Sequence, residues 1–191
     1  MPLDCLAGPF LANPAKVAAE VAAQVLAPPP PVDLNVWARE RVRFGSDSPF
    51  PGAYDERRFP YFRRILEVLG PDHPAREVVL KKSAQLGGTV LAQIFIGGSM
   101  DLDPGPTLYV HPTEGNGIRW SKTKWRPFVR NNLPGLFAPA TSRDASNSTL
   151  YQERKDGQGW LQISGANSEA SLSMISVLRQ VQDDLSKWEP N

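Results

Sequence analysis

The segment VVLKKSAQLGGT, residues 78–89, combines the residue types that a phosphate-binding loop needs. A β-branched apolar run ends at two lysines. A loop of small residues then leads through two glycines to Thr89 and to an apolar stretch that can start a helix. Glycines let backbone N–H groups turn toward an anion, a lysine neutralises phosphate charge, and a threonine hydroxyl can ligate magnesium. The order strand, loop, helix is also that of a phosphate-binding loop.

The standard nucleotide-binding pattern, G-x-x-x-x-G-K-[ST], is nevertheless not met. Gly88 stands before Thr89 where a lysine is expected, and the lysines lie at the front of the loop instead, at Lys81 and Lys82. The residues of this segment alone therefore leave two interpretations open. One is a phosphate-binding loop, and the other is a tight strand-to-helix turn of an ordinary α/β protein.

A nucleotide site also needs a carboxylate, because magnesium prefers oxygen ligands and hydrolysis requires a group that orients water. Asp183 and Asp184 follow an apolar stretch and are expected at the end of a strand. In that position the first acid faces the metal and the second faces the attacking water. The alternative for such a pair is a surface turn or a helix cap.

Apolar periodicity predicts the elements that position these residues. Strands are expected at 78–80, 107–111, 160–164 and 174–181. Helices are expected at 57–69, from an opening at 90–96, and at 115–131 with an interruption at Pro127. This alternation predicts an α/β fold with a mostly parallel sheet and helices on both faces. Ligands of such sheets bind beyond the carboxyl ends of the strands. Residues 82–89, 112–113 and 165–168 are expected at that edge.

Residues 1–33 are predicted to form a mobile N-terminal arm, separate from a domain at residues 34–191. The arm contains an alanine-rich helix at residues 15–26 with Asn13 as its cap. Prolines at positions 28–31 then force an extended spacer.

Composition excludes several classes of protein. The 191 residues carry a net charge of +1 and are 41% hydrophobic, as in soluble globular domains. A single cysteine excludes an internal disulfide and, with only two histidines, a typical zinc site. No apolar run approaches the ~20 residues that cross a bilayer, and no secretory signal is recognisable. The composition therefore predicts a protein of a reducing cytoplasm without a membrane partner.

Basic charge is concentrated in residues 119–130, which contain five basic residues and no acidic one. Trp120, Trp125 and Phe128 are interleaved with them. Basic residues with aromatics suit a track for a phosphate backbone or a surface between subunits. The alternative is a solvated helix face whose tryptophans turn inward.

Seven stretches of the chain resemble, in the same order, the N-terminal ATPase part of the large terminase subunits of tailed bacteriophages, the lambda-like GpA family. They are PGAYDERRFPYFRRILEVL, VVLKKSAQLGGT, DPGPTLYVHPT, WSKTKWRPFVRN, SRDASNSTL, ISGANSEASL and VQDDLSKWE. The family's phosphate loop carries its lysine at the front, as this chain does. The resemblance implies a three-layer P-loop NTPase fold of the RecA/ASCE type. That fold is incomplete at the C-terminus, because the sequence ends soon after the acidic pair.

The resemblance also implies roles for individual residues in a site for ATP and Mg²⁺. The phosphate loop would consist of Lys82, Ser83, Ala84, Gln85, Leu86, Gly87, Gly88 and Thr89. Lys82 would contact the β- and γ-phosphates, and the two glycines would supply backbone donors. Thr89 and Asp183 would hold magnesium, and Asp184 would orient the attacking water.

Three further residues are placed near the nucleotide by the same resemblance. Tyr61 lies where the family has an aromatic beside adenine, so stacking on the base is implied; the alternative is a core tyrosine. Asn167 and Ser168 would lie near the γ-phosphate, and their alternative role is hydrogen bonding within the loop.

Some features depart from the family pattern. The acidic pair is Asp-Asp where Asp-Glu is usual, and the shorter side chain predicts slow hydrolysis. Ala84 and Gln85 occupy the middle of the loop, where related motors often carry an arginine. A charge-stabilising arginine would then come from Arg119, Arg143 or a neighbouring subunit. The family's nuclease domain has no counterpart in this sequence, so no nuclease activity is expected.

The function implied by the resemblance is a motor that hydrolyses Mg–ATP to drive viral DNA into a procapsid in the cytoplasm of the bacterial host. Its implied partners are double-stranded DNA, the small terminase subunit, the portal or procapsid, and further copies of itself in a homo-oligomer. Two alternatives stay open. One is an assembly module that binds the small terminase subunit without hydrolysing ATP, and the other is a helicase-like translocase ATPase.

Overall fold

A computed structural model describes residues 13–26, 31–46, 48–139, 148–168, 172–173 and 175–188. The chain divides into two compact units, Met1–Pro31 and Val32–Asn191. The first unit contains helix α1, Pro14–Leu26, whose N-terminus is capped because the Asn13 Oδ1 atom accepts a hydrogen bond of 3.0 Å from the Ala15 N–H. The predicted helix and its cap are thus confirmed, whereas most of the predicted proline spacer lies outside the described residues.

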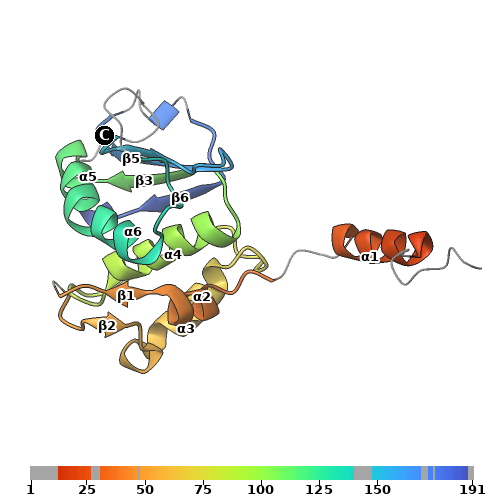
Figure 1. Ribbon diagram of the computed structural model, residues 1–191. Helices are drawn as coiled ribbons and strands as arrows, with labels where there is room; N and C mark the ends of the chain where they lie inside the picture. Colours follow the sequence, from red (N-terminus) through yellow and green to blue (C-terminus); the bar gives the residue numbers. More distant parts are fainter. Residues whose placement is uncertain are drawn as a thin grey trace, which may run out of the picture. The chain divides into compact units, whose positions relative to one another are not determined.

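The second unit contains the helices and strands that surround the candidate site (Figure 1). Its helices are α2 (Leu34–Arg41), the 3₁₀ turn η2 (Glu56–Arg58), α3 (Pro60–Leu69), α4 (Gly88–Leu102), α5 (Glu114–Trp120), the π-helical turn η3 (Ser121–Trp125), α6 (Arg126–Asn132) and the 3₁₀ turn η4 (Leu185–Lys187). Its strands are β1 (Arg43–Phe44), β2 (Gly52–Ala53), β3 (Thr107–His111), β4 (Tyr151–Glu153), β5 (Trp160–Gly165) and β6 (Arg179–Gln182).

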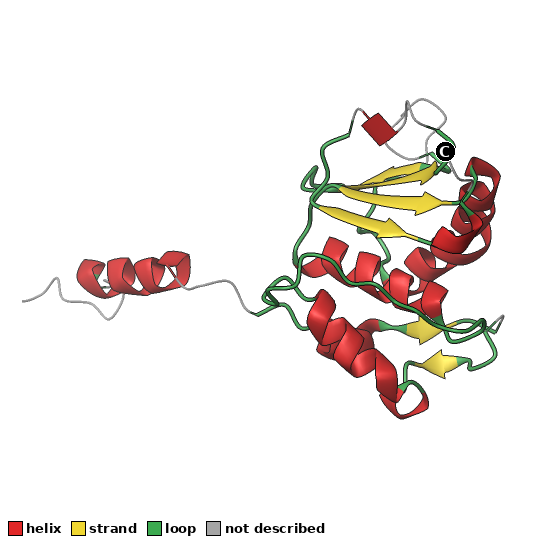
Figure 2. Cartoon of the chain, turned by 180° about the vertical axis from the view of Figure 1, so that it is seen from behind, coloured by secondary structure: helices red, strands yellow, loops and turns green. Residues whose placement is uncertain are grey.

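The main sheet has four strands in the order β4-β5-β3-β6. Strand β3 lies in the centre and runs parallel to both β5 and β6, with Tyr109 opposite Ile163 on one side and opposite Val181 on the other. Only β4 is antiparallel, to β5. Helix α4 leads into β3 and covers one face of the sheet (Figure 2). The predicted α/β class with a mostly parallel sheet is therefore confirmed.

The prediction of a first core strand at residues 78–80 is wrong. Residues 77–83 belong to no strand, and the Val79 and Leu80 side chains are 74% and 42% exposed. An apolar β-branched run becomes a strand only where another strand accepts its backbone hydrogen bonds. In the described part of the chain, no strand of either sheet pairs with this segment.

Three other element boundaries differ from prediction. The strand expected at 174–181 is four residues long and begins only at Arg179, while Met174 lies outside the described residues. The helix expected at 57–69 is broken at Phe59, because Pro60 starts α3 anew in its first turn. The helix expected at 115–131 is continuous through Pro127, and the irregularity precedes it as the π turn η3.

Pro127 accounts for that π turn. Proline lacks the N–H that would bond to the carbonyl of Thr123, and its ring crowds that carbonyl. The helix widens instead, so the Arg126 N–H donates to the Ser121 carbonyl five residues earlier. The widened turn is held from α4, where the buried Gln93 side chain donates to the Lys124 carbonyl at 2.8 Å.

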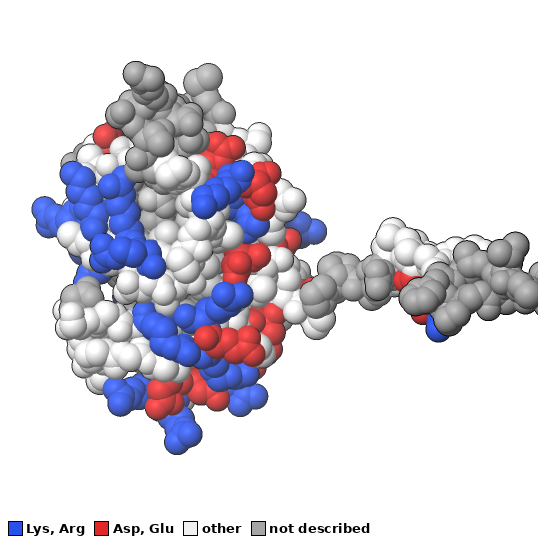
Figure 3. Space-filling model, in the orientation of Figure 1, with Lys and Arg blue, Asp and Glu red and all other residues white. Residues whose placement is uncertain are grey.

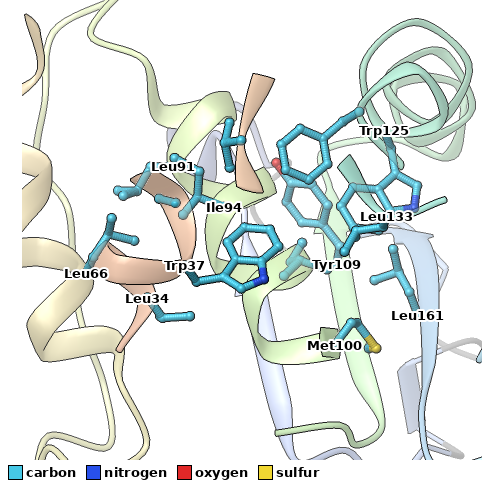
Figure 4. Packing of buried hydrophobic residues seen from close by; sticks show 14 of the residues in the cluster. Leu34, Trp37, Leu66, Leu91, Ile94, Met100, Tyr109, Trp125, Leu133 and Leu161 are labelled. Carbon is cyan, nitrogen blue, oxygen red and sulfur yellow. The ribbon is translucent and has the colours of Figure 1, made fainter. Parts of the chain in front are cut away.

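The core lies on the face of the sheet that carries Tyr109, Leu161 and Ile163. Figure 4 shows Tyr109 and Leu161 among side chains from α2, α4 and the π turn, including Trp37 and Trp125. On the opposite face, Gln180 and Gln182 of β6 are exposed. All five residues of β3 are buried, as expected for a central parallel strand that is covered on both faces.

Two glycines allow α2 and α6 to approach α4 closely. A Cβ atom at Gly97 would lie 2.8 Å from a ring carbon of Phe128, and one at Gly98 would lie 2.7 Å from a methyl of Leu34. The Trp37 indole completes this junction by donating to the Asp101 carboxylate at 2.8 Å. No helix in the described part of the chain is both long and apolar enough to cross a membrane.

Candidate nucleotide-binding site

The predicted phosphate loop ends in an uncapped helix. Gly87 has a left-handed backbone, with φ of 73°, and serves as the N-cap of α4 without any side-chain cap hydrogen bond. Gln85 is also left-handed, with φ of 65°, which a non-glycine residue rarely adopts. The loop therefore curls before α4 and leaves the first N–H groups of the helix without a side-chain acceptor. Such groups, together with the helix dipole, favour an anion at this position.

The Lys82 side chain lies against the first residue of α4. A Cβ atom added at Gly88 would lie 2.3 Å from Lys82 Cε and 3.0 Å from Lys82 Nζ, so a side chain at position 88 would require the end of this lysine to move. The glycine before Thr89 thus lets the lysine lie directly against the helix terminus. A lysine from the front of the loop occupies the space beside the helix terminus, where the standard pattern places a lysine from position 88.

Helix α3 packs against the loop and contacts it through two aromatic side chains. A Cβ atom at Gly87 would lie 2.9 Å from the Phe62 ring, and the Tyr61 hydroxyl donates to the Leu86 carbonyl at 3.2 Å. The family resemblance assigns Tyr61 to the adenine base; the structure places its partly exposed ring beside the loop, edge-on to Phe62. Phe62 lies within the helix expected at 57–69, and apolar spacing does not reveal its contact with the loop.

Asp183 is fixed at the carboxyl end of β6 by three hydrogen bonds. Its N–H donates to the Val110 carbonyl at 2.9 Å, its carbonyl accepts from the Trp188 indole at 3.0 Å, and its Oδ2 atom accepts from the Tyr109 hydroxyl at 3.0 Å. Two of these partners come from the neighbouring strand β3. The Asp183 carboxylate is consequently positioned by the register of β3 against β6, which the sequence alone does not reveal.

The groups that face Asp183 are neutral near pH 7. Burial raises the pKa of the Tyr109 phenol well above its ordinary value, and the Asp183 charge raises it further. Burial lowers the pKa of His111, whose Nδ1 atom lies 3.8 Å from Asp183 Oδ2. The Tyr109 ring is itself held between His111 and Trp120, edge-on to the latter. Neither neighbour brings a positive charge to Asp183, so the carboxylate keeps its capacity to attract a cation.

Asp184 has a different environment from Asp183. It is exposed, its backbone is left-handed with φ of 49°, and its carboxylate accepts a hydrogen bond from Lys187 in the following turn η4. This bond raises the pKa of Lys187. The predicted pair of acids at a strand end is therefore present, with one acid anchored by the sheet and the other held by an exposed surface cation.

The loop and the acidic pair lie at the same edge of the domain. The carboxyl ends of β3, β5 and β6 point to the side from which α4 starts, as the arrowheads and the first turn of α4 show in Figures 1 and 2. Residues 165–168 lie at the end of β5 at this edge, where the Asn167 Oδ1 atom lies close to Gly165. Arg143, the other candidate source of an arginine, lies outside the described residues.

The available donors suit a hard cation shared with a nucleotide. Thr89 offers a hydroxyl and Asp183 a carboxylate, which are the oxygen ligands that Mg²⁺ takes along with phosphate oxygens. In the described part of the chain, no group of three or more His, Cys, Asp or Glu side chains could hold a metal by itself. Two surface pockets of about 250 and 240 Å³ lie away from these residues, one beside Ser164 and one beside Asn132.

Comparison with known proteins identifies one family. Residues 48–191 match the family model of the phage terminase large subunit gpA, ATPase domain. No curated protein and no solved structure matches the chain. The matched range includes α3, the loop, the sheet and the acidic pair.

Proposed function

Because the chain belongs to the family of phage terminase large-subunit gpA ATPase domains, we propose that it binds Mg–ATP at residues 82–89 and hydrolyses it in the viral DNA-packaging motor. The observation that supports this site most strongly is the Lys82 side chain lying over Gly88 at the start of α4. A lysine ammonium and the N–H groups of a helix terminus converge there, and both attract phosphate. The proposed fold is a P-loop NTPase with a three-layer arrangement.

Binding of the triphosphate uses backbone and side chain together. The N–H groups at the start of α4 donate to phosphate oxygens, and Lys82 neutralises charge on the β- and γ-phosphates. The remaining loop residues, Ser83 to Leu86, set the backbone curvature, and Tyr61 anchors that curvature through Leu86. The exposed part of the Tyr61 ring is available to the adenine base.

Thr89 and Asp183 are proposed to hold the magnesium ion that accompanies ATP. When bound, this ion neutralises the charge that develops on the β- and γ-oxygens during phosphoryl transfer. Tyr109 keeps the Asp183 carboxylate in one orientation by donating to Oδ2, which leaves Oδ1 for the cation. The carboxylate therefore needs little reorganisation when the nucleotide arrives.

Hydrolysis requires a water molecule in line with the bond between the γ-phosphorus and the bridging oxygen. We assign the orientation of this water to Asp184. The Asp184 carboxylate accepts a hydrogen bond from the water while the water oxygen attacks the γ-phosphorus. The bond to the bridging oxygen breaks, ADP leaves with that oxygen, and the proton of the water goes to the released phosphate. The hydrogen bond between Lys187 and the Asp184 carboxylate must break first, and the Asp184 side chain is short. Slow turnover is therefore expected from this chain alone.

Calorimetric titration with Mg–ATP tests the site. Lys82→Ala should weaken binding by roughly 10- to 100-fold, because a charge-assisted hydrogen bond contributes about 1.5–3 kcal/mol. Lys81→Ala is the matched control, since Lys81 is an adjacent exposed lysine and should leave the affinity unchanged. Equal affinities of wild type and Lys82→Ala would remove this lysine from the site.

A second candidate function is supported by the separate N-terminal unit. The helix α1 belongs to Met1–Pro31, which forms a unit apart from the α/β domain. Such an arm suits docking of the small terminase subunit during assembly.

The partners proposed for the whole motor are this subunit, the portal or procapsid, duplex DNA and further copies of the chain. A steady-state ATPase assay, run beside a binding assay with the small subunit, separates a motor from a non-hydrolysing assembly module.

A further inference from the structure

A face of uncompensated positive charge runs along α5, the π turn η3 and α6. We call it the basic face and define it by Arg119, Lys122, Lys124, Arg126 and Arg130. Four of these side chains are exposed and Arg126 is partly so. Figure 3 shows Lys and Arg gathered over this part of the domain with little acidic surface between them.

Among the described residues, these cations lack the acidic partners that several other cations of the domain have. Arg39, Arg154 and Arg179 each form a salt bridge with an acidic side chain, to Glu56, Asp156 and Asp103. Among the described residues, no salt bridge involves any member of the basic face. Unpaired like charges on neighbouring helical turns repel one another, which costs stability unless an anion neutralises them.

The aromatic residues interleaved with the basic face are not available for stacking. Trp120, Trp125 and Phe128 are only 6%, 0% and 6% exposed, and the Trp125 indole donates to buried Gln152 at 2.8 Å. Single-stranded nucleic acids are bound through aromatic platforms on which bases stack. The basic face offers charge without such platforms, which suits the phosphate backbone of a duplex.

The basic face is also rigid and long enough to meet several phosphates. Gln93 fixes the π turn from α4, and the Ser121 hydroxyl donates to the Thr149 carbonyl at 2.5 Å. At ~1.5 Å rise per residue, the face extends roughly 16 Å. Each strand of duplex DNA carries one charge per about 3.4 Å of helix axis.

From these observations we propose that the basic face binds the phosphate backbone of double-stranded DNA without reading its sequence. The inference deepens the proposed function, on which it rests, by naming the surface that contacts the DNA. The surface itself is defined without reference to the nucleotide loop. Its test can therefore fail separately from that of the ATP site.

The test measures binding of the full chain to a fluorescein-labelled duplex of about 30 base pairs, by anisotropy, between 50 and 200 mM KCl. The basic-face variant is Lys122→Gln/Lys124→Gln/Arg130→Gln, which leaves Arg119 in place because it is a candidate for charge stabilisation in hydrolysis. The control variant removes the same charge from other exposed positions, as Arg57→Gln/Arg76→Gln/Lys155→Gln.

We expect the basic-face variant to bind the duplex at least tenfold more weakly than wild type at 100 mM KCl. The slope of log K against log[KCl] should become shallower by about one for each phosphate that the variant no longer neutralises. The control variant should keep both the affinity and the slope of wild type. A single-stranded oligonucleotide of equal length should bind more weakly than the duplex.

Four results would overturn the proposal. Wild type does not bind the duplex, or both variants bind it equally more weakly than wild type. Alternatively, the basic-face variant binds the duplex as tightly as wild type, or wild type binds single strands or polyglutamate more tightly than the duplex. Circular dichroism verifies that each variant is folded, and the three single substitutions repeat the test with smaller changes. Mg–ATP titration of wild type is run in parallel. If wild type binds the duplex but not Mg–ATP, only the proposed ATP site is contradicted. If wild type binds Mg–ATP but not the duplex, only the proposed role of the basic face is contradicted.

Discussion

Asp183 depends on Tyr109 for its orientation, and this dependence can be measured. Tyr109→Phe keeps the ring that packs on Trp120 but removes the hydroxyl that donates to the carboxylate. Because groups that orient metal ligands typically change metal affinity 10- to 100-fold, the variant should need about tenfold more Mg²⁺ for half-maximal ATPase activity. ATP binding without Mg²⁺ should stay unchanged. An identical Mg²⁺ dependence in variant and wild type would show that the Tyr109 hydroxyl has no positioning role.

Tyr54 provides a test of stability that is independent of function. Its hydroxyl is buried and has no hydrogen-bond partner among the described residues, and burial raises its pKa to about 12. The folded pKa exceeds the ordinary value of about 10, so its contribution to stability is complete below pH 10. That contribution is lost as the pH rises through 12, because the unfolded chain releases the proton more readily.

Tyr54→Phe should therefore do two things. At pH 8 it should leave the free energy of unfolding unchanged or raise it by up to about 1 kcal/mol, because an unsatisfied buried hydroxyl is removed. Between pH 10 and 12 its stability should fall less steeply than that of wild type, in urea unfolding curves. A decrease of more than about 1 kcal/mol at pH 8 would mean that the hydroxyl has a partner.

Among the site residues, those with distinctive chemistry were predictable and those that position them were not. Lys82 and Asp183 were identified by their types, their order and the family resemblance, and their roles stay proposals. Tyr109 and Phe62 look like ordinary core residues in the sequence. Their contacts depend on the register of β3 against β6 and on the packing of α3 under the loop, which join segments far apart in the chain.

At the scale of elements, the packing of α4 makes a prediction about two glycines. Gly97→Ala gains about 1 kcal/mol of helix propensity, but its methyl group would lie 2.8 Å from Phe128 and 3.1 Å from Trp37. Overpacking of this kind costs about 1–3 kcal/mol, so the net change should be destabilising. Gly115→Ala in α5 is the control, since its methyl group meets nothing closer than 3.9 Å and should stabilise by up to about 1 kcal/mol. The measurement is the midpoint of thermal unfolding of both variants and wild type. A Gly97→Ala variant that is more stable than wild type would contradict the close packing of α4.

Helices and strands that are set by local pattern were predicted well. The helix α4 and the strands β3 and β5 follow from apolar periodicity and from flanking prolines and glycines, and all three were confirmed. Residues 78–80 have the composition of a strand but no pairing partner, and a strand is a property of pairs. The π turn depends on how Pro127 is accommodated against Gln93, which apolar spacing does not encode.

The chain combines a separate N-terminal unit with an α/β domain, and the proposed ligand edge of this domain is formed by three parallel strand ends and the start of α4. The tryptophans of residues 119–130 turn inward, as one of the two interpretations predicted, yet the cations beside them stay unpaired among the described residues. The residues substituted to test the ATP site and those substituted to test the basic face do not overlap. This separation allows each to be removed by substitution while the other is measured.

The proposed Mg–ATP site is tested most directly by a crystal structure of the chain with a non-hydrolysable ATP analogue and with Mn²⁺ in place of Mg²⁺, the metal being located by anomalous scattering. We predict one metal position with the Thr89 hydroxyl at about 2.0–2.2 Å and Asp183 bound directly or through one water. We also predict the β- and γ-phosphates at the start of α4, beside Lys82. A metal or nucleotide found elsewhere, or Thr89 and Asp183 too far apart to share one ion, would contradict the proposed site.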